Sequence, residues 1–157
     1  MNVRWRTDWP SVQFIAHIQV AVGINTTGTM KTSRRNYPRI HHRMPVSVQF
    51  PDGNWMRAEL INISPNGLLV RFEKEQLDEL LAEQRRNASA APVQVQLWLE
   101  FPLQGSERGM RASCQVLVPR RVSKLEYHVP MVFLEVEPAG VHNLNRFICS
   151  ERARATA

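Results

Sequence analysis

The sequence predicts a mainly β fold with six antiparallel strands, a short helix between the third and fourth strands, and a C-terminal helix. Two observations support this prediction. From Met44 onward, apolar and polar residues alternate in short runs that are separated by turn-forming residues. Two other segments repeat their apolar residues at helical spacing. Short strands at regular spacing are typical of a sandwich or a closed barrel, and closure leaves no exposed strand edges.

The first two strands are predicted to form a hairpin. Val46, Val48 and Phe50 alternate with polar residues and lead into a turn signal, Pro51-Asp52-Gly53-Asn54. The chain then returns through residues 55–63. We therefore expect these two strands to be antiparallel neighbours.

A third strand is predicted over residues 67–72, and the periodicity then changes. Between Lys74 and Arg86, Leu77, Leu80 and Leu81 form one apolar helical stripe, while acidic residues occupy other positions. This pattern indicates a short helix that covers part of the sheet.

Three further strands and a helix complete the prediction. Residues 93–101 alternate cleanly between apolar and polar side chains, and residues 110–119 and 127–136 give the fifth and sixth strands. After Pro138, a helical stripe contains Val141, Leu144, Phe147 and Ile148.

We expect an N-terminal extension over residues 1–32, one domain over residues 33–150 and a C-terminal tail over residues 151–157. A chain of 157 residues that is 43% hydrophobic can bury a proper core. The apolar alternation in the extension is imperfect, so an extra strand, a segment that folds on binding and disorder all stay open. The extension is too short and too polar for a membrane span, and we expect Met30 to be the native start.

The formal charge of +6 favours anionic partners, which include nucleotides, nucleic acid and acidic protein surfaces. The positive charge is concentrated near the start of the chain. Before Met44 there are seven Lys and Arg residues and a single acidic residue, Asp8. The basic field therefore lies close to the motifs described next.

The cysteine and histidine residues indicate neither a disulfide framework nor a metal site. The only cysteines are Cys114 and Cys149, which we expect to be reduced thiols in a cytoplasmic protein. There is no C-x-x-C pair, and the adjacent His41 and His42 would point to opposite faces of an extended chain. We also find no catalytic triad spacing, so an enzyme is not expected.

A cluster of three arginines precedes the first strand: Arg34, Arg35 and Arg39. Pro38 disfavours the α conformation in the residue before it, so Arg35 and Arg39 are not expected to form a helical pair. In an extended chain their α-carbons would lie about 12–13 Å apart. Two long guanidinium side chains could still close on one ligand that carries several acceptors.

A second cluster, Asn62-Ile63-Ser64-Pro65-Asn66-Gly67, ends one strand and starts the next. Asn62 and Ser64 are two residues apart, so in a strand they point to the same face. Residues 64–67 suit a type I turn, because they offer a side-chain acceptor, a proline, a turn former and a glycine in order. A positive φ at Gly67 would close the hairpin with a bulge, and the missing Cβ would let a flat ring approach the backbone.

Together the two clusters resemble the motifs of the PilZ domain family. That family carries an RxxxR motif, often preceded by another Arg, and then [D/N]xSxxG. Residues 35–39 and 62–67 match these motifs, and the resemblance extends from about Ser33 to Ile148. It implies a six-stranded PilZ-type β-barrel with a C-terminal helix. It also implies binding of cyclic di-GMP, a bacterial second messenger, without any further cofactor.

The resemblance also implies a role for each matching residue. Arg35 and Arg39 would grip the guanine edge and the phosphates, with support from Arg34. From the barrel, Asn62 and Ser64 would contact the guanine and the ribose-phosphate edge. The remaining motif residue, Gly67, would give steric room.

The sequence departs from many family members at two positions. Asn62 stands where Asp is common, and its NH₂ group cannot accept a second guanine N–H. Pro130 stands where Gly is common, and proline removes a ladder donor unless it lies at an edge or bulge. These departures are expected to affect ligand recognition and the pocket rim.

We therefore expect a cyclic di-GMP receptor that changes conformation on binding and signals to a protein partner, for example in motility or biofilm control. One alternative is a ligand-silent PilZ adaptor that works through protein contacts. Another is a basic small barrel that binds single-stranded nucleic acid through charge and stacking. Nucleic acid is the less favoured partner, and the sequence leaves the effector and the oligomeric state open.

Overall fold

The computed structural model describes residues 39–86, 91–105 and 108–157. The predicted extension over residues 1–32 lies outside these ranges, as do Arg34 and Arg35. The described elements follow one another as β1 (Ile40–Gln49), β2 (Trp55–Ser64), β3 (Gly67–Glu73), α1 (Lys74–Arg86), β4 (Gln94–Glu100), β5 (Gly109–Val116), β6 (Arg120–Arg121), β7 (Glu126–Val136) and α2 (Pro138–Ala155).

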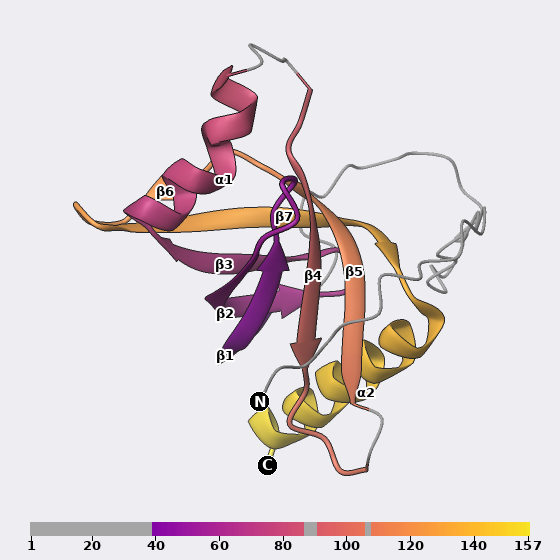
Figure 1. The fold of residues 1–157 in the computed structure, drawn as a ribbon. Helices are drawn as coiled ribbons and strands as arrows, with labels where there is room; N and C mark the ends of the chain where they lie inside the picture. The colour runs from indigo at the N-terminus through magenta and orange to yellow at the C-terminus, as the bar shows by residue number, and fades with distance from the viewer. Residues whose placement is uncertain (1–38, 87–90, 106–107) are drawn as a thin grey trace, which may run out of the picture. The chain divides into compact units, whose positions relative to one another are not determined.

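Six long strands form a closed antiparallel barrel, which confirms the predicted fold (Figure 1). β1 pairs with β2 and β4, β2 with β3, and β4 with β5. The ring is completed by β7, which pairs with β3 along one edge and with β5 along the other. Each long strand therefore has a hydrogen-bonded neighbour on both sides, so the barrel has no long open edge.

The element boundaries differ from the prediction in two places. β1 begins at Ile40 rather than at Met44, because its first residues pair with the end of β2 across an irregular register. The predicted fifth strand ends early, at Val116, and residues 120–121 instead form the short strand β6 on β7.

The core follows the alternation seen in the sequence. Inward-facing residues from every long strand are nearly inaccessible to solvent, and both helices add apolar side chains to them. The largest fully buried side chains are those of Phe72, Phe101, Phe147, Leu60, Ile63, Leu80, Leu97, Leu99, Met110, Met131, Val46 and Val48.

The two helices lie near opposite ends of β4 (Figure 1). In α1, Leu77 and Leu80 are buried, as the apolar stripe predicts. The C-terminal helix α2 begins with Pro138, whose fixed φ suits the first helical turn. α2 continues to Ala155, so it includes most of the segment predicted as a tail.

Phe147 anchors α2 to the barrel. Its ring stacks on Phe101 with a centroid distance of 4.8 Å and meets the edge of His42 at 5.3 Å. One turn earlier, the side chain of Asn143 donates a hydrogen bond of 2.9 Å to the carbonyl of Gly109. Stacking and a buried hydrogen bond thus fix the helix against β4, β5 and β1.

We predict that Phe147→Ala lowers the free energy of unfolding by about 3–5 kcal/mol, because it leaves a cavity beneath α2. Urea unfolding followed by circular dichroism would measure the change. Asn145→Ala, at an exposed position of the same helix, should change stability by less than about 0.5 kcal/mol. Equal effects of the two substitutions would contradict the anchoring role of Phe147.

Candidate functional site

A bulge in β2 decides which side chains face outward at the end of this strand. Leu60 pairs with Val70, but Asn62 pairs with Leu69, so Ile61 is an extra residue in β2. Leu60 and Ile63 are both fully buried. Since residues that face each other across two strands share a face, Asn62 lies on the outer wall with the half-buried Leu69.

Asn62 is only 5% exposed although it lies on the outer wall. Its side chain makes no hydrogen bond to any other described residue, whereas the second buried asparagine, Asn143, bonds to the Gly109 carbonyl. In the described part of the chain, no fully inaccessible side-chain nitrogen or oxygen lacks a partner, so the Asn62 amide reaches the surface. Buried polar groups are normally satisfied, so an amide without a partner among the described residues is unusual and leaves its donors and acceptor available.

Ser64 closes the turn that follows. Its hydroxyl accepts a hydrogen bond of 3.3 Å from the Asn66 N–H and donates one of 3.3 Å to the Gly67 carbonyl. These bonds form the predicted turn. They also mean that Ser64 has a structural task in addition to the expected ligand contact.

The turn glycine Gly67 does not have the positive φ considered from the sequence, and it has a packing role that was not predicted. Positive φ angles occur at Gly53 and Gly105 among the described glycines, but not at Gly67. A Cβ at Gly67 would instead clash with the carbonyl oxygen of Met131 in β7. The glycine is therefore required for the close approach of β3 and β7, which needs no ligand.

Arg39 is the motif arginine that the structure describes, and it is exposed immediately before β1. Ile40 pairs with Ile63 and His41 pairs with Asn62. Continuing this register by one residue places Arg39 at the level of Ser64. The fold thus brings Arg39, Asn62 and Ser64 to the same end of the outer wall.

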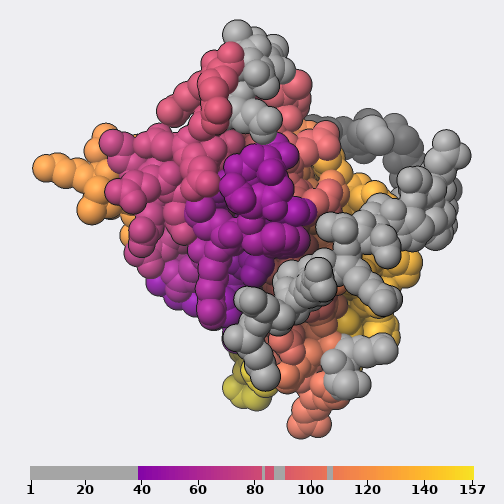
Figure 2. All heavy atoms as spheres, viewed as in Figure 1, coloured from indigo at the N-terminus to yellow at the C-terminus, as the bar shows by residue number. Residues whose placement is uncertain are grey.

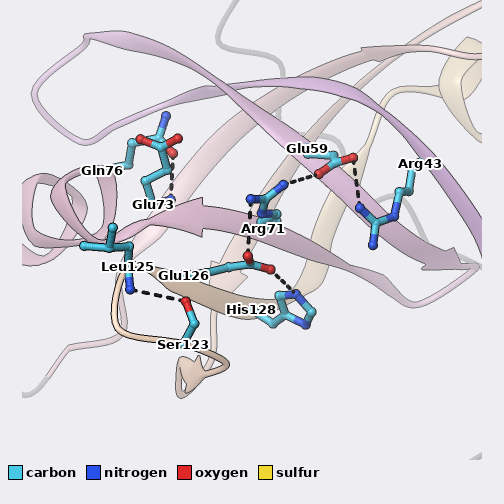
Figure 3. Close-up of polar contacts among 9 residues, drawn as sticks. All are labelled: Arg43, Glu59, Arg71, Glu73, Gln76, Ser123, Leu125, Glu126 and His128. Atoms are coloured by element: carbon cyan, nitrogen blue, oxygen red, sulfur yellow. Dashed lines mark hydrogen bonds and ion pairs between the residues drawn. The ribbon is translucent and has the colours of Figure 1, made fainter.

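Charged side chains form a row on the same outer wall, across β1, β2, β3 and β7 (Figure 3). Arg71 contacts the Glu59 carboxylate at 3.1 Å and the Glu126 carboxylate at 3.2 Å. Glu59 also contacts Arg43 at 3.6 Å, and Glu126 contacts His128 at 3.2 Å. The hydrogen bond from Arg71 to Glu59, followed by the charge of Glu126, raises the pKa of Arg71.

This ion-pair row was not predicted from the sequence. Opposite charges at outward positions of different strands were the available signal, but their pairing depends on which strands are neighbours. Arg71 and Arg43 are already paired with carboxylates, whereas no ion pair joins Arg39 to another described residue. Arg39 is therefore the better placed of these arginines to meet an anion.

Comparison with known proteins identifies the family. A sequence profile of the PilZ domain matches residues 33–149. The chain belongs to the PilZ domain family. The matched region contains both motifs and the whole described barrel, and it extends through most of α2.

Two solved structures illustrate the shared fold. The Bacillus subtilis inhibitor of motility (MotI/DgrA) has 15% identity and a TM-score of 0.60, with 77% of this chain and 52% of that chain covered. The K. pneumonia MrkH–cyclic di-GMP complex has 12% identity and a TM-score of 0.52, with 78% and 54% covered. The chain therefore spans about half the length of either protein. No curated protein matches the chain in sequence.

Pro130 is compatible with the barrel of this PilZ domain. Its carbonyl accepts a hydrogen bond of 2.9 Å from the Leu117 N–H. In an antiparallel strand the N–H and C=O of one residue point to the same side, so the missing donor of Pro130 faces residues 117–119. On this side the β5 pairs end at Met131 and the β6 pairs begin at His128, so the missing donor of Pro130 lies between them. Pro130 therefore does not weaken the pairing of β7 with β3.

The described residues contain no group of three or more His, Cys, Asp or Glu side chains that could hold a metal ion. None of the described helices is long and apolar enough to cross a membrane. Burial raises the pKa of the Cys114 thiol to about 12, while Cys149 is exposed. Cys114 is therefore a core residue and is not activated as a nucleophile.

We predict that Gly67→Ala destabilises the domain by about 1–3 kcal/mol, since the added methyl group must displace the β7 backbone. Urea unfolding without ligand would measure this loss. Asn66→Ala, in the same turn with an exposed side chain, keeps the backbone N–H and is the matched control. Unchanged stability of Gly67→Ala would show that the wall tolerates a side chain here.

The two cysteines should differ in their reaction with iodoacetamide at neutral pH. The folded protein should take one label, at Cys149, because Cys114 is buried and its thiolate forms only near pH 12. Intact-mass measurement would count the labels, and unfolding in urea should raise the count to two. A label on folded Cys149→Ser would contradict the burial of Cys114.

Proposed function

We propose that this chain is a receptor for cyclic di-GMP that binds the ligand on its outer barrel wall and signals to a protein partner. The observation that carries the proposal is the Asn62 amide, which the β2 bulge turns outward and which has no partner among the described residues. It lies beside Arg39 in a PilZ domain, a family whose solved members include MrkH bound to cyclic di-GMP. We take residues 33–150 as the receptor domain.

The chemistry of the ligand suits this wall. Cyclic di-GMP presents two guanines and two phosphodiesters, and an arginine fork can donate two hydrogen bonds to guanine O6 and N7 or pair with phosphate oxygens. In our proposal Arg39 and Arg35 make these contacts, and Arg34 supports them. The Asn62 carbonyl accepts a guanine N–H, and its NH₂ group donates to a ligand acceptor.

Ser64 and Gly67 have smaller roles in the proposed site. The Ser64 oxygen keeps a lone pair beyond its two turn hydrogen bonds, which allows one contact to the ribose-phosphate edge. Gly67 allows the turn to pack closely against β7, and because it has no side chain it leaves space for a ligand on the outer wall. The two residues therefore shape the wall, while Asn62 and the arginines recognise the ligand.

The conformational signal would pass through β1. Ligand binding draws the arginine segment onto the wall, and this segment leads directly into β1. Near the start of β1, His42 contacts Glu151 at 3.2 Å and the ring of Phe147, both of which belong to α2. A shift at the start of β1 would therefore be transmitted to the C-terminal helix through these contacts. We propose motility or biofilm control as the output, and no catalytic activity.

We predict that isothermal titration calorimetry of the full chain detects binding of cyclic di-GMP and no binding of GTP or a short oligonucleotide. Arg39→Ala should weaken binding about ten- to a hundredfold, because it removes charge-assisted hydrogen bonds of roughly 1.5–3 kcal/mol each. Asn62→Ala should also weaken binding, since it removes the amide.

Arg85→Ala is the matched control, because Arg85 is an exposed arginine on α1 that pairs with Asp78. Its affinity should equal that of the unsubstituted chain. No binding by a folded chain in an orthogonal assay would refute the receptor role and favour a ligand-silent adaptor. Binding of the oligonucleotide alone would favour a nucleic-acid partner.

A further inference from the structure

The exposed apolar side chains of the barrel are concentrated in one segment. Within the described residues, seven large apolar side chains are exposed, and six of them fall between residues 117 and 134. Val118 and Leu125 are 84% and 71% exposed. The full set in this segment is Leu117, Val118, Val122, Leu125, Val132 and Leu134, and the seventh residue is Trp55.

Residues 117–125 form a projecting arm that includes β6, seen in orange on the left of Figures 1 and 2. Hydrogen bonds fix its base: Leu117 N–H donates to Pro130 at 2.9 Å, and Lys74 N–H donates to the Leu125 carbonyl at 2.9 Å. Near its tip, the Val122 N–H donates to the backbone carbonyl of Glu126 at 3.0 Å. Backbone hydrogen bonds thus hold the segment that carries these apolar side chains in a defined conformation.

The arm is also basic. Arg120, Arg121 and Lys124 are exposed, and residues 117–125 contain no acidic side chain. The nearest acid along the chain, Glu126, already contacts Arg71 and His128. The arm therefore carries three positive charges around its exposed aliphatic groups and no acidic side chain of its own.

The apolar surface continues from the arm along the outer wall of β7 toward the candidate ligand site. Val132 pairs with Gly67, and Pro130 pairs with Leu69, which itself faces Asn62. A molecule that covers the arm and this part of β7 would border the Gly67 turn.

We infer that residues 117–125, with Val132 and Leu134, form a docking surface for a protein partner that presents acidic and aliphatic side chains together. Contiguous exposed apolar area with a polar rim is typical of interaction sites. Acidic groups on the partner would complement Arg120, Arg121 and Lys124, and its aliphatic groups would cover Val118 and Leu125.

A protein suits this surface better than an anionic membrane does. Glu73 at the end of β3 and Glu75 and Glu79 in α1 are exposed, and between them the Lys74 N–H donates to the Leu125 carbonyl. A continuous anionic lipid surface would be repelled by these carboxylates, whereas a protein can place its acidic groups opposite the arm alone. Val132 and Leu134 lie on the strand wall beyond the arm, so insertion of the arm tip alone would leave them uncovered.

Nuclear magnetic resonance titration of the isotope-labelled full chain tests this inference. The probe is a short peptide of alternating Glu and Leu, and the control peptide carries Lys in place of Glu. Shifts caused by the acidic peptide should concentrate in residues 117–134, and the basic peptide should cause none. Val118→Asp combined with Leu125→Asp should weaken binding about tenfold or more, because apolar burial is lost.

Matched variants separate the docking surface from general effects. Arg120→Glu with Arg121→Glu should also weaken binding, whereas Arg152→Glu on α2 should leave it unchanged. Trp55→Ser, which removes the exposed apolar side chain outside the patch, should likewise have no effect. Equal binding of both peptides, or shifts located elsewhere or absent, would overturn the inference.

Two further outcomes would also overturn it. Binding to phosphatidylglycerol vesicles without binding to the acidic peptide would assign the arm to a membrane surface. Concentration-dependent shifts of the patch in the absence of peptide would assign it to a second copy of this chain. The titration needs no cyclic di-GMP, so its result is independent of the proposed receptor function. A second titration with cyclic di-GMP present would depend on that function, because it asks whether the ligand changes the affinity for the peptide.

Discussion

The register shift between Leu60 and Asn62 keeps Leu60 and Ile63 in the core while it turns Asn62 to the outer wall. In an unbroken strand, Leu60 and Asn62 would share a face, and either the core would take up an amide or the wall would expose a leucine. One extra residue in β2 avoids both costs. The register after this bulge also positions the Ser64 turn and the contact of Gly67 with β7. It places Arg39 opposite Ser64.

Electrostatics and packing divide the outer wall into regions with different properties. The row through Arg71 contains both signs of charge in mutual contact, so it stabilises the sheet locally and offers little net field to a ligand. Beside it, Leu69, Pro130 and Val132 give an apolar strip. In the proposed receptor, recognition of an anionic ring compound on this wall therefore depends on Asn62 and on the motif arginines, of which Arg39 immediately precedes β1.

Sequence patterns predicted the parts of the fold that depend on local information. Alternation located the long strands to within a few residues, and leucine spacing located α1. The bulge at Ile61, the short β6 and the Arg71 ion pairs were not predicted, because each depends on register between strands that are distant in sequence. The positive φ considered for Gly67 was wrong, and its close contact with Met131 was not predicted because Met131 belongs to the distant strand β7. The ligand-site roles of Arg34, Arg35, Arg39, Asn62, Ser64 and Gly67 stay predictions.

The pairing of β3 with β7 also determines when the barrel can close during protein synthesis. Gly67 faces Val132, and the two segments that meet there are separated by α1, β4, β5 and β6. While the ribosome has made only the first three strands, the wall beside Asn62 lacks its β7 neighbour. The barrel closes only after β7 has left the exit tunnel, and pairing of such distant segments is slow compared with hairpin formation. A nascent chain therefore carries both sequence motifs well before it carries the complete wall.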